Sequence, residues 1–85
     1  MPRELKIQVL LFAAVAENAG WNDQMMDLPE GSRVTDLRQI MVQQHPQIEA
    51  SLGRARIAVN EVFAAEDTRL QAGDVVAVIP PVAGG

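Results

Sequence analysis

The chain is 85 residues long, carries a net charge of −4 and is 48% hydrophobic, which indicates one small globular domain. The acidic balance argues against nucleic acid as a partner, because phosphates are bound by clustered Lys and Arg. The absence of cysteine excludes disulfides, metal–thiolate sites and persulfide chemistry on this chain. With His45 as the single histidine, we expect no bound metal and no conventional side-chain catalysis. No apolar run approaches the ~20 residues that cross a bilayer, so we expect a cytoplasmic protein without a membrane partner.

The first third of the chain predicts a strand, a short helix and a second strand. "LKIQVLLF" (5–12) alternates apolar and polar residues at first and then becomes apolar on both faces, which predicts a strand. The Ala-rich "AAVAENAG" that follows predicts a short helix ending at Gly20. "WNDQMMDL" (21–28) predicts a weaker strand that ends at the "PEG" turn, and we expect its tryptophan and both methionines to serve packing.

The clearest helix is "VTDLRQIMVQQHP", where apolar residues recur at helical spacing. Thr35 is the expected N-cap, and Asp36 lies in the first turn, where the helix dipole favours a carboxylate. His45 falls in the last turn, and Pro46 ends the helix because it lacks an N–H.

The second half of the chain predicts three more strands. We expect "QIEASLG" (47–53) to be irregular. "RARIAVNEVFA" then predicts a strand, a tight reversal at Asn60-Glu61 and a short returning strand. Arg54 and Arg56 lie at the start of that first strand, as solvated residues or at most one edge of a protein interface. A polar turn leads into the β-branched strand "VVAVI" (75–79).

This order of elements predicts an α+β fold with an unevenly covered sheet. A single long helix can cover one face of a sheet. The first and last predicted strands are nevertheless apolar on both faces, since Leu10 and Phe12 point away from the Leu5/Ile7/Val9/Leu11 side. A buried central strand would explain the second apolar face, but we favour an exposed patch that awaits a partner.

The sequence ends in "PPVAGG", an unusual combination of stiff and small residues. Proline is locked near φ ≈ −65°, so Pro80 and Pro81 should hold the chain extended and away from the sheet. From Pro81 to Gly85 the segment can reach about 16–18 Å at ~3.3–3.6 Å per residue. Because its last residues are small, this tail could enter a narrow channel. The terminal carboxylate is the only reactive group that it would bring there. We therefore divide the chain into a domain at 1–79 and a protruding tail at 80–85.

Taken together, "LLFAAVAENAG", "IAVNEVF" and "LQAGDVVAVIPPVAGG" resemble the small subunit of molybdopterin synthase along essentially the whole chain. That resemblance implies a ubiquitin-like β-grasp fold, with a mixed sheet of about five strands, one main helix and short helical turns. It also implies a sulfur carrier. A partner enzyme of the ubiquitin-activating type adenylates the carboxyl group of Gly85 at the expense of ATP, and sulfur then replaces one oxygen to give a thiocarboxylate. The carrier binds no cofactor itself.

The same resemblance implies a place for each site residue. Gly85 carries the sulfur, inside a heterotetramer of two small and two large synthase subunits that builds the dithiolene of molybdopterin. Phe12, Phe63 and Ile79 form the apolar surface for the large subunit, although Phe63 could equally lie in the core. The small subunit is then the sulfur donor of a two-subunit sulfurtransferase and has no side-chain active site of its own. Residues that aim the tail or give it clearance are Pro80, Pro81, Val82, Ala83 and Gly84.

Two departures from the family pattern and three rival functions accompany this interpretation. Ala16 stands where many relatives carry Arg, so a salt bridge to the partner there is in doubt, and Ala83 replaces the commoner Ser or Thr. A carrier of the thiamine-thiazole type shares the Gly-Gly end but usually lacks the double proline. The second rival is a protein modifier joined to lysines, as ubiquitin is, and the third is a plain binding module.

Overall fold

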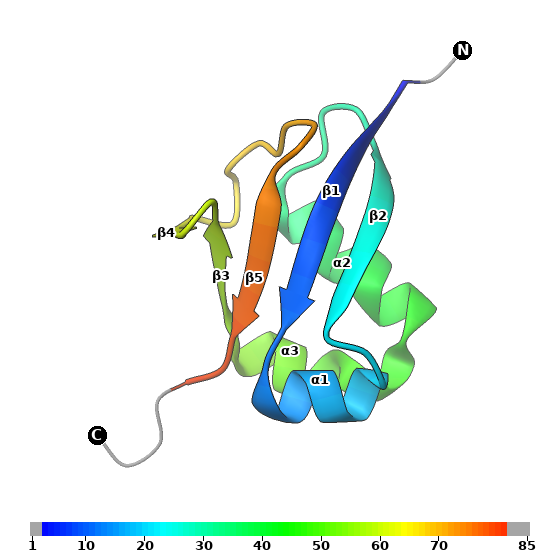
Figure 1. Cartoon of the computed structure of the whole chain (residues 1–85), viewed down its shortest axis with the longest axis vertical. Helices are drawn as coiled ribbons and strands as arrows, with labels where there is room; N and C mark the ends of the chain where they lie inside the picture. The colour runs from blue at the N-terminus through cyan, green and yellow to red at the C-terminus, as the bar shows by residue number, and fades with distance from the viewer. Residues whose placement is uncertain (1–2, 82–85) are drawn as a thin grey trace.

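The computed structural model describes residues 3–81, which form one five-stranded sheet with its longest helix behind one face and its shorter helices gathered at one end of the sheet (Figure 1). The elements are β1 (Glu4–Leu11), α1 (Ala13–Ala19), β2 (Asp23–Pro29), α2 (Val34–Gln44), the 3-10 helix η1 (Pro46–Ile48), α3 (Glu49–Arg54), β3 (Arg56–Val59), β4 (Val62–Phe63) and β5 (Val75–Ile79). This is the mixed sheet with one main helix and short helical turns that the family resemblance implies.

The strand order is β2-β1-β5-β3-β4, so strands from opposite ends of the sequence lie side by side at the centre. β1 and β5 are parallel, with Leu11 opposite Val78, whereas the other neighbouring strands are antiparallel. Figure 1 shows β1 and β5 running side by side in the same direction, in front of α2. Both strands therefore end on the same side of the molecule, and from the end of β5 the chain continues into Pro80.

The core lies between the sheet and α2. Alternate residues of the two central strands point toward the helices, because successive side chains of a strand face opposite sides. From β1 and β5 the fully buried side chains include Ile7, Val9, Val76 and Val78, and α2 contributes Val34, Leu37 and Met41. On the two central strands the covered face is thus apolar, as the alternation predicts.

The predicted N-cap of α2 is wrong. The helix begins at Val34, and its N-cap is Arg33 rather than Thr35. The backbone N–H of Arg33 donates to the carboxylate of Asp36 at 2.8 Å, which supplies the reciprocal half of a capping box. Val34 is fully buried, so the helix starts two residues earlier than side-chain preference alone indicates. At the other end His45 is the C-cap, and its N–H donates to the carbonyl of Met41 at 2.8 Å.

The segment expected to be irregular is helical instead. Residues 46–54 form η1 and α3, and their apolar residues Ile48 and Leu52 lie four apart on one buried face. The guanidinium of Arg38 on α2 donates to the carbonyls of Leu52 at 2.7 Å and Ala55 at 2.8 Å, which satisfies the C-terminal end of α3. A six-residue helix is marginal alone, so this tertiary cap and burial explain why local propensity does not reveal it.

Two predicted turns are confirmed. Gly20 closes α1 in the left-handed conformation at φ 86°, which glycine adopts without steric cost. Asn60 and Glu61 reverse the chain between β3 and β4 with φ values of 51° and 71°. Arg54, expected at a strand start, instead ends α3, whereas Arg56 does begin β3.

Candidate functional site

The face of the sheet opposite the helices, called here the open face, carries the candidate site. In the described part of the chain no helix packs on this face (Figure 1). Toward the ends of β1 and β5 it is apolar, whereas toward the start of β1 it carries polar pairs such as Lys6 and Asp27, whose Nζ and Oδ1 atoms lie 3.8 Å apart. The exposed apolar patch favoured from the sequence is therefore present at one end of the sheet.

Two phenylalanines stand on either side of a hollow in the open face. Phe12 follows β1 and Phe63 ends β4, and their side chains are 48% and 52% exposed. Ala58 lies opposite Ala77 between them, and these small side chains leave a hollow of about 410 Å³. Its apolar lining consists of Leu10, Phe12, Ala58, Phe63, Val75, Ala77 and Ile79. Phe63 is thus not a core residue, which resolves that alternative.

The chain leaves the sheet beside this hollow. Ile79 is the last residue of β5 and lines the hollow, and it lies opposite Arg56 in the register of β3 and β5. The guanidinium carbon of Arg56 lies 3.8 Å from the centre of the Phe63 ring, a cation–π contact. Pro80 is half-buried and Pro81 is exposed, and Figure 1 shows this segment departing from the end of β5. The apolar hollow and the start of the tail therefore share one edge of the molecule.

The remaining tail residues, Val82, Ala83, Gly84 and Gly85, lie outside the described residues. Their roles, and the division of the chain after residue 79, stay predictions. The structure brings Phe12, Phe63, Ile79 and Pro80 to one edge, which is the arrangement that the predicted interface requires.

Of three further residues that the sequence singles out, Met25 differs from expectation. Ala16, on α1, is half-buried and packs against the core, so at this position the chain offers partners a methyl group and no charge. Trp21 packs against the core as expected, and its Nε1–H donates to Nε2 of His45 at 3.4 Å. Met25, expected to serve packing, is 53% exposed on β2, because its neighbour Met26 takes the position that faces the core.

Sequence reasoning misses two members of the site. Ala58 has no visible role in the sequence, because its place on the floor of the hollow depends on the register between β3 and β5. Glu61 is predicted only as a turn residue, yet it also lines the hollow. The hairpin length is the signal that could have placed both, since it fixes which residues of β3 and β4 share a face.

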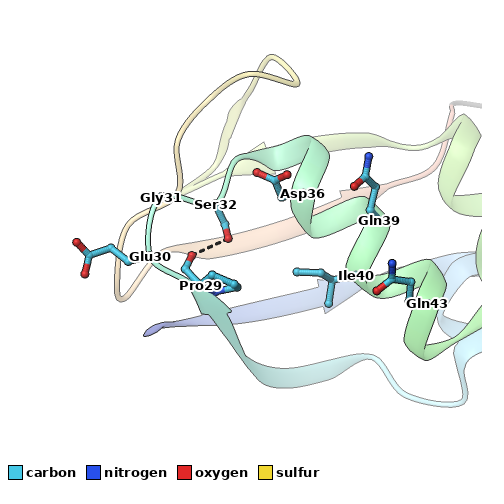
Figure 2. A pocket seen from close by; sticks show the side chains of 8 residues that line it. All are labelled: Pro29, Glu30, Gly31, Ser32, Asp36, Gln39, Ile40 and Gln43. Atoms are coloured by element: carbon cyan, nitrogen blue, oxygen red, sulfur yellow. Dashed lines mark hydrogen bonds between the residues drawn. The ribbon is translucent and has the colours of Figure 1, made fainter. Parts of the chain in front are cut away.

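A second hollow beside α2 has a different character. Figure 2 shows it between the β2–α2 turn and the helix, where the Ser32 hydroxyl donates to the carbonyl of Pro29 at 2.6 Å. Its lining is open and mixed, with the polar side chains of Asp36, Gln39 and Gln43 along the helix. Across residues 3–81 no three His, Cys, Asp or Glu side chains are grouped to hold a metal ion. Within the same residues, no helix is long and apolar enough to traverse a bilayer.

A mixed five-stranded sheet crossed by one long helix, with the chain leaving its last central strand beside an apolar patch, defines a ubiquitin-like β-grasp protein. The chain belongs to the ThiS family, whose profile matches residues 9–85. It is 34% identical over 83 residues to the molybdopterin synthase sulfur carrier subunit of Chlamydomonas reinhardtii, covering 95% of this chain and 100% of that one. Its identity to the same subunit of Mycobacterium tuberculosis is 35% over 82 residues, covering 95% and 99%. The predicted resemblance and fold are confirmed.

Solved structures agree with this assignment. A molybdopterin converting factor subunit 1 from Pyrococcus furiosus, described as putative, superposes with a TM-score of 0.85 at 34% identity, over 92% of this chain and 99% of that one. Small archaeal modifier protein 1 of Haloferax volcanii gives 0.84 at 28% identity, with coverages of 92% and 99%. A complex of subunits 1 and 2 of the molybdopterin-converting factor from Helicobacter pylori gives 0.69 at 27% identity, with coverages of 95% and 100%. Homologues of this chain are thus subunits of a sulfur-transferring synthase.

Proposed function

We propose that this protein is the sulfur carrier subunit of a cytoplasmic molybdopterin synthase and that the carboxyl group of Gly85 is its working group. The observation that carries the proposal is the position of Ile79 and Pro80, which lead the chain out of the sheet at the rim of the apolar hollow. A partner that covers the hollow would be held beside the emerging tail. Family membership over residues 9–85 extends the likeness through the Gly-Gly end.

The chemistry requires activation because a carboxylate is a poor electrophile. In the proposed first step a carboxylate oxygen of Gly85 attacks the α-phosphorus of ATP on an activating enzyme, and pyrophosphate leaves. A donor that supplies sulfur at the sulfide level then attacks the acyl carbon through that sulfur, and AMP leaves with the electron pair of the broken C–O bond, so that no oxidant or reductant is needed. The sulfur of the resulting thiocarboxylate replaces an oxygen substituent of the pterin precursor by forming a C–S bond, and water cleaves the acyl C–S bond, which returns Gly85 to a carboxylate. Two rounds are needed for one dithiolene. The carrier binds no cofactor in this scheme, since ATP is consumed on the activating enzyme.

The described residues of the chain supply binding and orientation. Phe12 and Phe63 offer half-exposed aromatic rings, and aromatic side chains are enriched at the energetic centre of protein interfaces. We propose that the large synthase subunit covers this hollow in a heterotetramer of two small and two large subunits. The apolar contact would hold the base of the tail while its end reaches the catalytic groups of the large subunit.

Removal of Gly85 tests the proposal. The shortened chain should fold with an unchanged melting temperature, because a terminal glycine has no side chain to contribute to a core, and should lose all sulfur transfer in a reconstituted synthase assay. A matched control replaces Ala83 with Ser, which should leave transfer within about two-fold. After incubation of the full chain with the activating enzyme, ATP and a sulfur donor, intact mass should show one oxygen-to-sulfur exchange. Normal transfer by the shortened chain would refute the proposal.

Protein modification is a second candidate, favoured by the likeness to the archaeal modifier protein. In that case the activated Gly85 carbonyl would be attacked by a lysine Nζ of a target. Lys6 is the only lysine among the seven cationic side chains of this chain, so any self-conjugate through a lysine must involve that residue. Lysine-linked conjugates in the same mass experiment would support this candidate, and their absence would favour the carrier alone.

A further inference from the structure

The Asn60-Glu61 turn at one end of the hollow holds a residue in an unfavourable backbone conformation. Both residues have positive φ, at 51° and 71°, as the two central residues of a tight hairpin with this twist require. Asparagine tolerates this region, whereas glutamate does so poorly because its Cβ crowds the backbone. Glycine is the residue that this second position favours. The presence of Glu61 there calls for a reason other than the turn.

The two turn residues differ in what their side chains do. The side-chain amide of Asn60 accepts from the N–H of Val75 at 3.0 Å and donates to Asp74 at 2.9 Å, so it fastens the hairpin to the start of β5. The carboxylate of Glu61 makes no hydrogen bond and no ion pair with any residue between 3 and 81. Glu61 is exposed and lines the hollow. Its side chain therefore has no role inside the described domain.

Side chains of opposite charge lie near the two ends of the hollow, Glu61 in its lining and Arg56 in contact with the lining residue Phe63. Arg56 lies at the end where the tail begins, opposite Ile79 in the sheet register and over the ring of Phe63. Glu61 lies at the other end, in the hairpin turn that Asn60 anchors to Val75. Between them the lining is apolar. Apolar contact alone has little directionality, whereas a charge at each end distinguishes one orientation of a partner from the reverse.

We propose that Glu61 is a specificity-determining residue that pairs with a lysine or arginine of the large synthase subunit and so fixes the orientation of that subunit on the hollow. This inference rests on the proposed function. It explains why a glutamate occupies a glycine-type position: the carboxylate is retained for an intermolecular contact and the backbone strain is tolerated. Pairing at the end far from the tail would align the hollow so that Pro80 points into the large subunit.

Two substitutions at this position separate strain from charge. Glu61→Gln keeps the strain and removes the charge, so the melting temperature should stay within about 2 °C. Its affinity for the large subunit should fall about two- to five-fold at low ionic strength, with the difference shrinking as salt is added. Glu61→Gly should lower the affinity to a similar extent yet raise the melting temperature by about 2–6 °C, because it relieves the strain.

Glu30→Gln is the matched control. It removes the same charge from the turn after β2, and Figure 2 shows the Glu30 side chain pointing away from the body of the protein, far from the hollow. Its affinity should equal that of the wild type at every salt concentration. Binding would be measured by isothermal titration calorimetry with the large subunit from the same organism, and stability by thermal melts.

The outcomes are distinguishable. If the wild-type chain binds the large subunit and Glu61→Gln binds equally well at low salt, the inference is wrong while the proposed function stands. An equal loss in Glu30→Gln and Glu61→Gln would also overturn it, since the effect would then come from net charge. If the wild-type chain does not bind the large subunit at all, the proposed function fails and this inference fails with it.

Discussion

The two faces of the sheet are built by the same strands and yet differ in what covers them. On β1, Ile7 and Val9 are fully buried beneath the helices, whereas Leu10 and, just after the strand, Phe12 lie on the open face with no helix over them. Both sets are apolar, so hydrophobicity alone does not tell which set is internal. What separates them is the number of helices in the described chain: one long helix and short helical segments cover a single face. An exposed apolar patch in so small a domain is typical of protein interaction sites, and this is the role that we propose for the open face.

The largest expected effect comes from the covered face. Leu37 on α2 is fully buried, and Leu37→Ala leaves a cavity that the surrounding side chains fill only in part. We expect the free energy of unfolding to fall by about 2–5 kcal/mol, measured by urea denaturation. Molecules that remain folded should bind the large subunit as the wild type does. A loss below about 1 kcal/mol would contradict the description of a tightly packed core on that side.

On the open face we expect the opposite result, a large loss of binding to the large subunit with a small loss of stability. Phe12→Asp should weaken binding of the large subunit by about 2 kcal/mol or more, close to 30-fold, because it places a charge in an apolar contact. The monomer should lose little stability, since the ring is half-exposed and residue 12 is the N-cap of α1, a position where aspartate is favoured. Gel filtration with the large subunit measures the loss of binding, and thermal melts of the isolated chain measure the change in stability. A large fall in melting temperature with intact binding would show that Phe12 is a core residue.

The smallest expected effect falls at the edge of the open face. Met25 on β2 is exposed but lies opposite Gln8, away from the hollow. Met25→Gln should change the affinity for the large subunit by less than about two-fold and the free energy of unfolding by less than about 0.5 kcal/mol. If it weakened binding as strongly as Phe12→Asp, the interface would extend over the entire open face and the hollow would not be its centre.

Much of the fold could be predicted because local pattern and final structure agree. The alternation in residues 5–12, the helical spacing after Val34 and the β-branched run at 75–79 each identify an element whose type the structure confirms. Gly20 and the Asn60-Glu61 reversal follow from backbone preferences that hold in any context. Where the pattern is weakest, tertiary contacts decide: α3 is short, contains Gly53 and depends on Arg38 to satisfy its carbonyl groups.

For the candidate site, the sequence identifies the phenylalanines but not their arrangement. Phe12 could be placed on the second face from alternation along β1. Phe63 could not, because β4 has only two residues and carries no periodicity of its own. The stacking of Arg56 on Phe63 and the place of Ala58 on the floor of the hollow depend on the register of three strands. Register between distant strands is a property of the folded chain that one sequence reveals only indirectly.

The parallel pairing of β1 with β5 has a consequence for how the protein comes into being. In these two central strands, residues 8–11 pair with residues 75–78. A chain emerging from the ribosome therefore has no partner for that side of β1 until β5 has been synthesised. Such long-range closure slows folding and leaves the unfinished sheet open to chaperones or aggregation. The tail that we propose to carry the sulfur follows directly after β5. We therefore expect the domain to reach its native state only once synthesis has advanced to the edge of the tail, so that an activating enzyme meets a reactive end attached to a finished fold.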